Sequence, residues 1–147
     1  MIYVTIGTTQ FDELIIAIDK IASKIDENII IQIGKGKYIP KNYQYFRFTK
    51  NPKKYYKKAN LVIAHGGAGT TFEVLNLQKK LISVANNKVP DSHQGDLLKK
   101  LSEENYIIWC KDVSKICDSI TQSKKFRFKK YVKPECTIHK IIMRLLG

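Results

Sequence analysis

Cysteine is scarce in this chain of 147 residues, and its three cysteines, Cys110, Cys117 and Cys136, follow no zinc-binding spacing. Their odd number excludes a complete disulfide framework, so we interpret them as free thiols. The three histidines have no cluster of cysteines or carboxylates beside them in the sequence. No metal site is therefore predicted.

Long hydrophobic runs are also missing. The longest, such as Ile29–Ile33 and Leu61–Ala64, are far shorter than the ~18 residues that cross a bilayer. The sequence opens on a strand-like segment rather than on a basic region followed by an apolar stretch, so no secretory signal is expected. These features predict a cytoplasmic protein.

Acidic residues are half as numerous as basic ones, 13 against 26, which leaves a net charge of +13. This excess favours polyanions: nucleic acid, anionic lipid headgroups or phosphorylated substrates. The basic residues concentrate in two runs that also contain aromatics, Lys50–Lys58 and Lys124–Lys133. They predict attraction to an anionic membrane surface at ~1 kcal/mol per well-placed charge. A solvated face in a Lys-rich composition is the simpler alternative.

Strand-like and helix-period segments alternate along the chain, which predicts an α/β fold: a Rossmann-like, doubly wound parallel sheet. Residues 1–122 are predicted to form this domain. Residues 123–147 are predicted to form a basic linker and, after Pro134, a C-terminal amphipathic helix that packs on the same domain or on a partner. The expected strands are Ile2–Ile6, Ile29–Ile33, Tyr43–Phe48, Leu61–Ala64, Leu81–Val84 and Tyr106–Trp109. Helices are expected over Phe11–Ile25, Pro52–Ala59, Ala68–Gln78 and Val113–Ile120, and from Asp91 or Ser92 onward.

A glycine-rich segment, His65-Gly66-Gly67-Ala68-Gly69-Thr70-Thr71-Phe72-Glu73, follows the fourth strand and opens a helix. Glycines let a ligand approach the backbone, and the free amides of a helix start suit a diphosphate. The two threonines can add hydroxyl donors, and Glu73 can reach a ribose diol one turn further on. The alternative is a tight turn without a ligand. The fingerprints of dinucleotide oxidoreductases and P-loop NTPases are absent, and Gly34-Lys35-Gly36-Lys37 is interpreted as a solvated turn.

Three motifs occur in an order that resembles the glycosyltransferase family 28 C-terminal domain. They are Met1–Ile15, Asn60–Thr70 with its glycines, and Asp91-Ser92-His93-Gln94. This family is the donor-binding half of GT-B enzymes. It includes the small cytosolic subunit of the dolichol-linked N-acetylglucosamine transferase and bacterial subunits of capsule and exopolysaccharide synthesis.

The resemblance implies a role for each matching residue. Gly7, Thr8 and Thr9 would face the donor's phosphates, and Glu73 would hold the ribose hydroxyls. The end of the third strand, Phe46–Thr49, would hold uracil. The start of the helix after the fourth strand would bind the diphosphate. Two side chains of the third motif would contact the sugar hydroxyls. The remaining donor-binding residues implied by the resemblance are His65, Gly67, Ala68, Gly69, Thr70, His93 and Gln94.

The implied function is transfer of a hexose from a UDP-sugar to a lipid-linked saccharide, with inversion, in capsule or exopolysaccharide synthesis. No Asp-x-Asp pair is present, so we predict a metal-independent reaction without a cofactor. Nothing in the chain matches the family's acceptor-binding domain, so a membrane-anchored partner subunit would supply it, and the general base, at the cytoplasmic face of the membrane. His65 could stabilise phosphate. The alternatives are a non-catalytic nucleotide- or nucleic-acid-binding module, although no nucleic-acid motif is present, and a degenerate scaffold.

Overall fold

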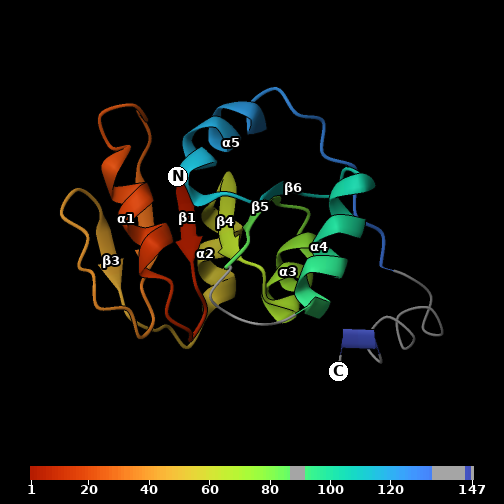
Figure 1. Ribbon diagram of the computed structural model, residues 1–147, viewed down its shortest axis with the longest axis horizontal. Coiled ribbons are helices and arrows are strands. Elements are labelled where there is room, and N and C mark those ends of the chain that lie inside the picture. Colours follow the sequence, from red (N-terminus) through yellow and green to blue (C-terminus); the bar gives the residue numbers. More distant parts are fainter. Residues whose placement is uncertain (87–91, 134–144, 147) are drawn as a thin grey trace.

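The fold is a six-stranded parallel sheet between two layers of helices (Figure 1). The computed structural model describes residues 1–86, 92–133 and 145–146, with residues 92–94 as backbone only. The strands lie in the order β3-β2-β1-β4-β5-β6. Their bounds are β1 Ile2–Thr5, β2 Ile29–Gln32, β3 Gln44–Phe46, β4 Leu61–His65, β5 Lys80–Val84 and β6 Ile108–Cys110. The predicted Rossmann-like sheet and all six predicted strands are therefore confirmed.

The helices divide between the two faces of the sheet. Buried residues of α1 and α5 share one core with β1, β2 and β4–β6. Residues of α2, α3 and α4 build the second core on the opposite face. The helix bounds are α1 Asp12–Lys20, α2 Pro52–Lys58, α3 Ala68–Asn76, α4 Ser92–Glu103 and α5 Ile116–Ser123, with a short 3₁₀ helix at Val113–Lys115. Among these helices none is long and apolar enough to cross a membrane.

The first helix is shorter than predicted. Its apolar period continues to Ile25, yet α1 ends at Lys20 and the chain continues as turns. Both Ile21 and Ile25 remain buried in the first core, each 8% exposed. The period persists because the turns keep these side chains on the sheet, so periodicity alone could not locate the helix end.

The strand order reverses between β1 and β4, which are neighbours in the sheet although β2 and β3 separate them in sequence. Their register pairs Thr5 with Ala64, so both strands end at the same level. Ligands of doubly wound sheets bind at such a reversal, outside the carboxyl ends of the strands. The two loops that follow β1 and β4 therefore flank the expected site.

The basic segment predicted as a linker folds back onto the domain, where Phe126 and Phe128 contact the first core. Tyr131 is 6% exposed and belongs to the second core. Its backbone is held at two points by Gln78, whose Nε2 donates to the Tyr131 carbonyl at 2.6 Å and whose Oε1 accepts from the amide at 3.2 Å. The C-terminal helix predicted after Pro134 lies largely outside the described residues.

Candidate functional site

The loop after β1 is held from below by a buried chain of hydrogen bonds. The Tyr3 hydroxyl donates to Gln32 Oε1 at 2.8 Å, and Gln32 Nε2 donates to the Gly7 carbonyl at 2.7 Å. Tyr3 is fully buried and Gln32 is 6% exposed. Gly7 has a φ of +63°, which disfavours any residue with a side chain. The loop's conformation is therefore fixed without a ligand.

Thr8 and Thr9 are exposed in this loop, as a donor-facing role requires. The Thr9 hydroxyl, however, already donates to the Ile6 carbonyl at 2.7 Å. The Thr9 carbonyl accepts from the Lys35 amide at 3.0 Å. A Cβ on Gly34, which has a φ of +55°, would lie 2.5 Å from that carbonyl. Gly34 is buried, so the turn predicted to be merely solvated packs closely against the β1 loop.

His65 ends β4, and its imidazole lies between two glycines of the site. A Cβ added to Gly7 would lie 2.9 Å from His65 Cε1, and one added to Gly67 would lie 2.6 Å from Nε2. Both distances are too short for real contacts. Gly7 and Gly67 thus make room for this ring, a role that the sequence did not indicate.

His65 is neutral in the free protein near pH 7. Burial lowers the pKa of its imidazole, and the backbone of Thr5 only partly opposes this effect. Nδ1 is buried and has no hydrogen-bond partner among the described residues. As a phosphate ligand His65 could therefore offer a ring N–H rather than a full positive charge.

The start of α3 presents free backbone donors. Its first helical bond joins the Thr71 amide to the Gly67 carbonyl at 3.0 Å, so the amides of Ala68, Gly69 and Thr70 precede the intrahelical pattern. No side chain of the described residues caps this end, and its first turn contains no acidic residue. A Cβ on Gly69 would meet no described atom within 4 Å. Among the described residues, no contact requires glycine at position 69.

The two threonines of this helix differ. Thr71 is fully buried and its hydroxyl donates to the Gly67 carbonyl at 2.7 Å. The prediction that Thr71 supplies a hydroxyl donor is therefore wrong. Thr70 is partly exposed. Burial raises the pKa of Tyr56 on α2, the Thr70 hydroxyl beside it opposes the shift, and the nearby charge of Glu73 adds to it. Glu73 itself is exposed and does not point into the core.

The end of β3, predicted to hold uracil, is largely engaged within the protein. The Phe46 and Arg47 carbonyls accept from the amides of Ile33 and Gly34 at 2.9 and 3.0 Å. Arg47 Nη1 donates to the Gly36 carbonyl at 2.8 Å. The Phe48 side chain is 52% exposed. A base placed here would meet this ring rather than those carbonyls.

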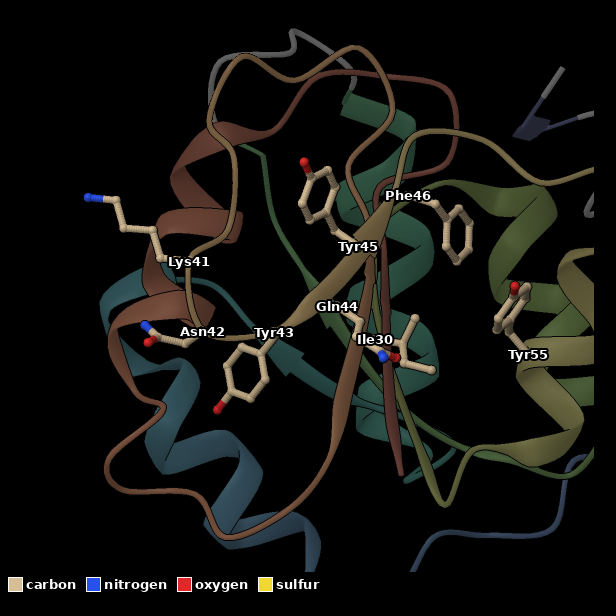
Figure 2. A pocket seen from close by; sticks show the side chains of 8 residues that line it. All are labelled: Ile30, Lys41, Asn42, Tyr43, Gln44, Tyr45, Phe46 and Tyr55. Carbon is tan, nitrogen blue, oxygen red and sulfur yellow. The ribbon is translucent and has the colours of Figure 1, made fainter.

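An open hollow of about 660 Å³ lies along the free edge of β3 (Figure 2). Phe46 and Tyr55 stand on one side of it and Tyr43 on the other, around Ile30 and Gln44. Of the residues predicted to bind the donor, only Phe46, in the segment expected to hold uracil, lines it. We therefore place the candidate site at the β1–β4 reversal rather than here.

Comparison with known proteins identifies the family. The sequence matches the glycosyltransferase family 28 C-terminal domain over residues 1–142. The chain belongs to this family. The human "UDP-N-acetylglucosamine transferase subunit ALG13" is 36% identical over 122 residues, which cover 74% of this chain and 11% of the human protein. An uncharacterized glycosyltransferase of Methanosarcina mazei is 28% identical over 124 residues, 72% of this chain and 32% of that protein.

Solved structures share the fold of this family 28 domain. A solution structure of ALG13 superposes with a TM-score of 0.62 at 18% identity and covers 99% of this chain and 94% of its own. Acinetobacter baumannii MurG gives a TM-score of 0.71 at 18% identity, over 99% of this chain and 49% of MurG. The chain thus corresponds in fold to about half of that bacterial protein.

The structure brings most of the predicted donor-binding residues of this family 28 domain to one end of the sheet. Gly7, Thr8 and Thr9 follow β1, while His65 and the start of α3 follow β4. The side chains of His93 and Gln94 lie outside the described residues. The supporting Tyr3 and Gln32 were not predicted. The only sign of this support in the sequence is the glutamine that ends the isoleucine-rich strand β2.

Proposed function

We propose that this chain is the donor-binding subunit of a UDP-sugar-dependent hexosyltransferase. The observation that carries the proposal is the start of α3, where no described side chain caps the helix and no described atom lies within 4 Å of a Cβ placed on Gly69. A glycine that no contact requires is what close approach of a ligand to the backbone would select. Membership of family 28 agrees with a nucleotide-sugar ligand at this end of the sheet.

The amides of Ala68, Gly69 and Thr70, with the dipole of α3, would bind the diphosphate of the donor. They would also stabilise the negative charge that grows on the leaving group as the sugar transfers. One such preorganised donor can contribute about 3 kcal/mol to transition-state stabilisation. The neutral His65 ring, placed beside Gly7 and Gly67, would add a neutral donor. This arrangement needs neither a metal nor a cofactor.

Glu73 would accept hydrogen bonds from the ribose hydroxyls, since it is exposed and lies one turn beyond the amides. The loop Gly7–Thr9 would contact the phosphates from the side opposite the start of α3. His93 and Gln94 would read the sugar. N-acetylglucosamine is the first sugar to test, because the ALG13 relatives are named for it.

The acceptor site would come from another chain. The relatives are named as subunits of a transferase, and this chain aligns with about half of MurG. We propose a membrane-anchored partner that binds a lipid-linked saccharide and contributes the general base, with inversion at the anomeric carbon. The basic surface would hold the complex at the cytoplasmic face of the membrane, in capsule or exopolysaccharide synthesis.

Calorimetric titration with UDP tests the donor site. Replacing Glu73→Ala is expected to weaken UDP binding about tenfold or more, as for loss of a charged hydrogen bond. The matched control is Glu103→Ala, an exposed carboxylate on α4. Equal UDP affinity of the Glu73→Ala and unmodified proteins would remove this residue from the site. Tight, salt-sensitive binding of single-stranded RNA with no UDP signal would favour the alternative, a nucleic-acid-binding module.

A further inference from the structure

A second hollow, of about 310 Å³, lies at the opposite end of the sheet from the glycine loops. Lys80, the first residue of β5, lines it and pairs in register with Leu61 at the start of β4. His65 is at the other end of that strand. The basic segment 128–131 forms the outer wall. The hollow is thus separate from the donor site, and it gives a defined set of contacts to the basic segment, which the proposed function assigns only in general terms to the membrane surface.

The wall of this hollow is fixed by backbone contacts. Gln78 and Asn105 both have a positive φ, 58° and 64°, and each bonds to the basic segment. Gln78 holds the Tyr131 backbone at two points. The Asn105 carbonyl accepts from the Lys129 amide at 2.8 Å. The lysines of this segment are therefore carried on a rigid wall rather than on a free tail.

Cations and rings line the hollow together. Lys129 Nζ lies 5.2 Å from the centroid of the Tyr106 ring and 3.9 Å from a Glu104 oxygen. Lys79 Nζ donates to the Lys57 carbonyl at 2.9 Å. Four lysines, Lys79, Lys80, Lys129 and Lys130, thus face one hollow.

The ammonium groups of two of these lysines, Lys80 and Lys130, form neither an ion pair nor a hydrogen bond among the described residues. Lys80 Nζ lies 6.0 Å from the Phe128 ring centroid. Within the part of the chain that the structure describes, neither Lys80 nor Lys130 has a carboxylate at ion-pair distance. Both are exposed at the hollow and free to contact an anion.

We propose that this hollow is a phosphate-binding site for an amphiphilic or aromatic phosphate ester. Lys80 and Lys130 would contact the phosphate, because ammonium groups bind phosphate as point charges. The Tyr106 and Phe128 rings would contact the apolar part of the ligand. The phosphate belongs either to a lipid headgroup or to a soluble ester. The site does not depend on the donor-binding proposal.

The test compares two variants that each remove two positive charges. Lys80→Ala/Lys130→Ala removes the free cations of the hollow. Lys99→Ala/Lys100→Ala removes two exposed lysines of α4 that do not line it. Equal thermal melts would show that both fold. Binding is measured to phosphatidylcholine vesicles with and without phosphatidylglycerol, by co-sedimentation. Phenyl phosphate, a soluble aromatic ester, is titrated in parallel while backbone amide resonances are followed by NMR.

A lipid ligand predicts that only the Lys80→Ala/Lys130→Ala variant loses binding to anionic vesicles, by about tenfold. A soluble ester predicts that phenyl phosphate shifts the amides of residues 78–80 and 128–131 in the unmodified protein and not in this variant, with vesicle binding unchanged. Equal vesicle binding in the two variants, together with no shift of those amides, would overturn the proposal. UDP affinity should be the same in all three proteins, so failure of the donor site would be seen separately.

Discussion

The imidazole of His65 fills the space beside Gly67, so that a Cβ on this glycine would lie 2.6 Å from Nε2. The same ring approaches Gly7 from the other side. The glycines of the site therefore serve two purposes. Gly7 and Gly67 accommodate a neighbouring side chain, whereas Gly69 borders open space. This division predicts opposite effects of the same substitution at different glycines.

Replacing Gly67→Ala should destabilise the free protein by about 1–3 kcal/mol, because the added methyl group overlaps the His65 ring. Removing the ring should relieve the clash. Urea unfolding of Gly67→Ala, His65→Ala and the double variant measures the coupling. We expect the double variant to be more stable than the sum of the two single effects. Additive effects would mean that the ring and the glycine do not compete for space.

Replacing Gly69→Ala should leave the stability unchanged or raise it by up to about 1 kcal/mol, since alanine favours the helix and meets no described atom here. UDP binding should nevertheless weaken, because the methyl group would occupy the space above the free amides. Thermal unfolding and calorimetry on the same sample check both signs. A variant with lower stability and normal UDP affinity would contradict the assignment of Gly69 to the ligand.

The buried chain from Tyr3 through Gln32 to the Gly7 carbonyl predicts a paired effect. Gln32→Leu leaves a buried hydroxyl and the carbonyl without their partner, which should cost about 1–3 kcal/mol. Tyr3→Phe in the same chain should recover part of the loss, because it removes the orphaned hydroxyl. Denaturant unfolding of the single and double variants tests this. If the double variant is no more stable than Gln32→Leu, the whole loss of stability comes from the unpaired Gly7 carbonyl.

Among the groups with shifted pKa values, His65 and Asp19 make the stability pH-dependent in separate windows. Burial lowers the pKa of His65, so its contribution is full above its ordinary pKa of about 6.5 and is lost as the pH falls toward the folded value. Burial alone would raise the pKa of Asp19, but bonds from Tyr38, Lys41 and Asn42 lower it. Its contribution is lost only in more acidic solution, as the pH falls from about 4 through the folded pKa.

Melting temperatures measured from pH 8 to pH 5 test the histidine window. The unmodified protein should lose stability as the pH falls below about 6.5, and His65→Gln, which does not titrate, should lose less. The slope of melting temperature against pH is compared rather than its level, since the substitution also changes the packing. Parallel slopes would show that another group controls this range.

The strands could be predicted from the sequence because parallel strands buried on both faces form continuous apolar runs, as Ile29–Ile31 does. The glycine-rich segment after β4 could also be predicted, because a strand followed by several glycines and a helix is typical of the ligand-binding loops of doubly wound sheets. The end of α1 could not be predicted, because Ile21 and Ile25 continue the helical spacing of apolar residues through the turns that follow the helix.

The internal support of the site could not be predicted, because it depends on contacts between residues far apart in sequence. Nothing local shows that Gly7 and Gly67 both face His65, or that Gln32 reaches the Gly7 carbonyl. Thr71 was assigned to the ligand from its residue type alone, whereas the helix start turns its hydroxyl back to Gly67. Whether a threonine hydroxyl is buried or exposed is decided by the fold, so its position in the sequence does not show it.

The clamp between Gln78 and the backbone of Tyr131 constrains how this domain can be exchanged between relatives. A chimera joined near residue 122 would separate a core aromatic from the glutamine that fixes it. A C-terminal segment taken from a relative should therefore be transplanted together with the turn between α3 and β5, because each of these two segments holds the other in place.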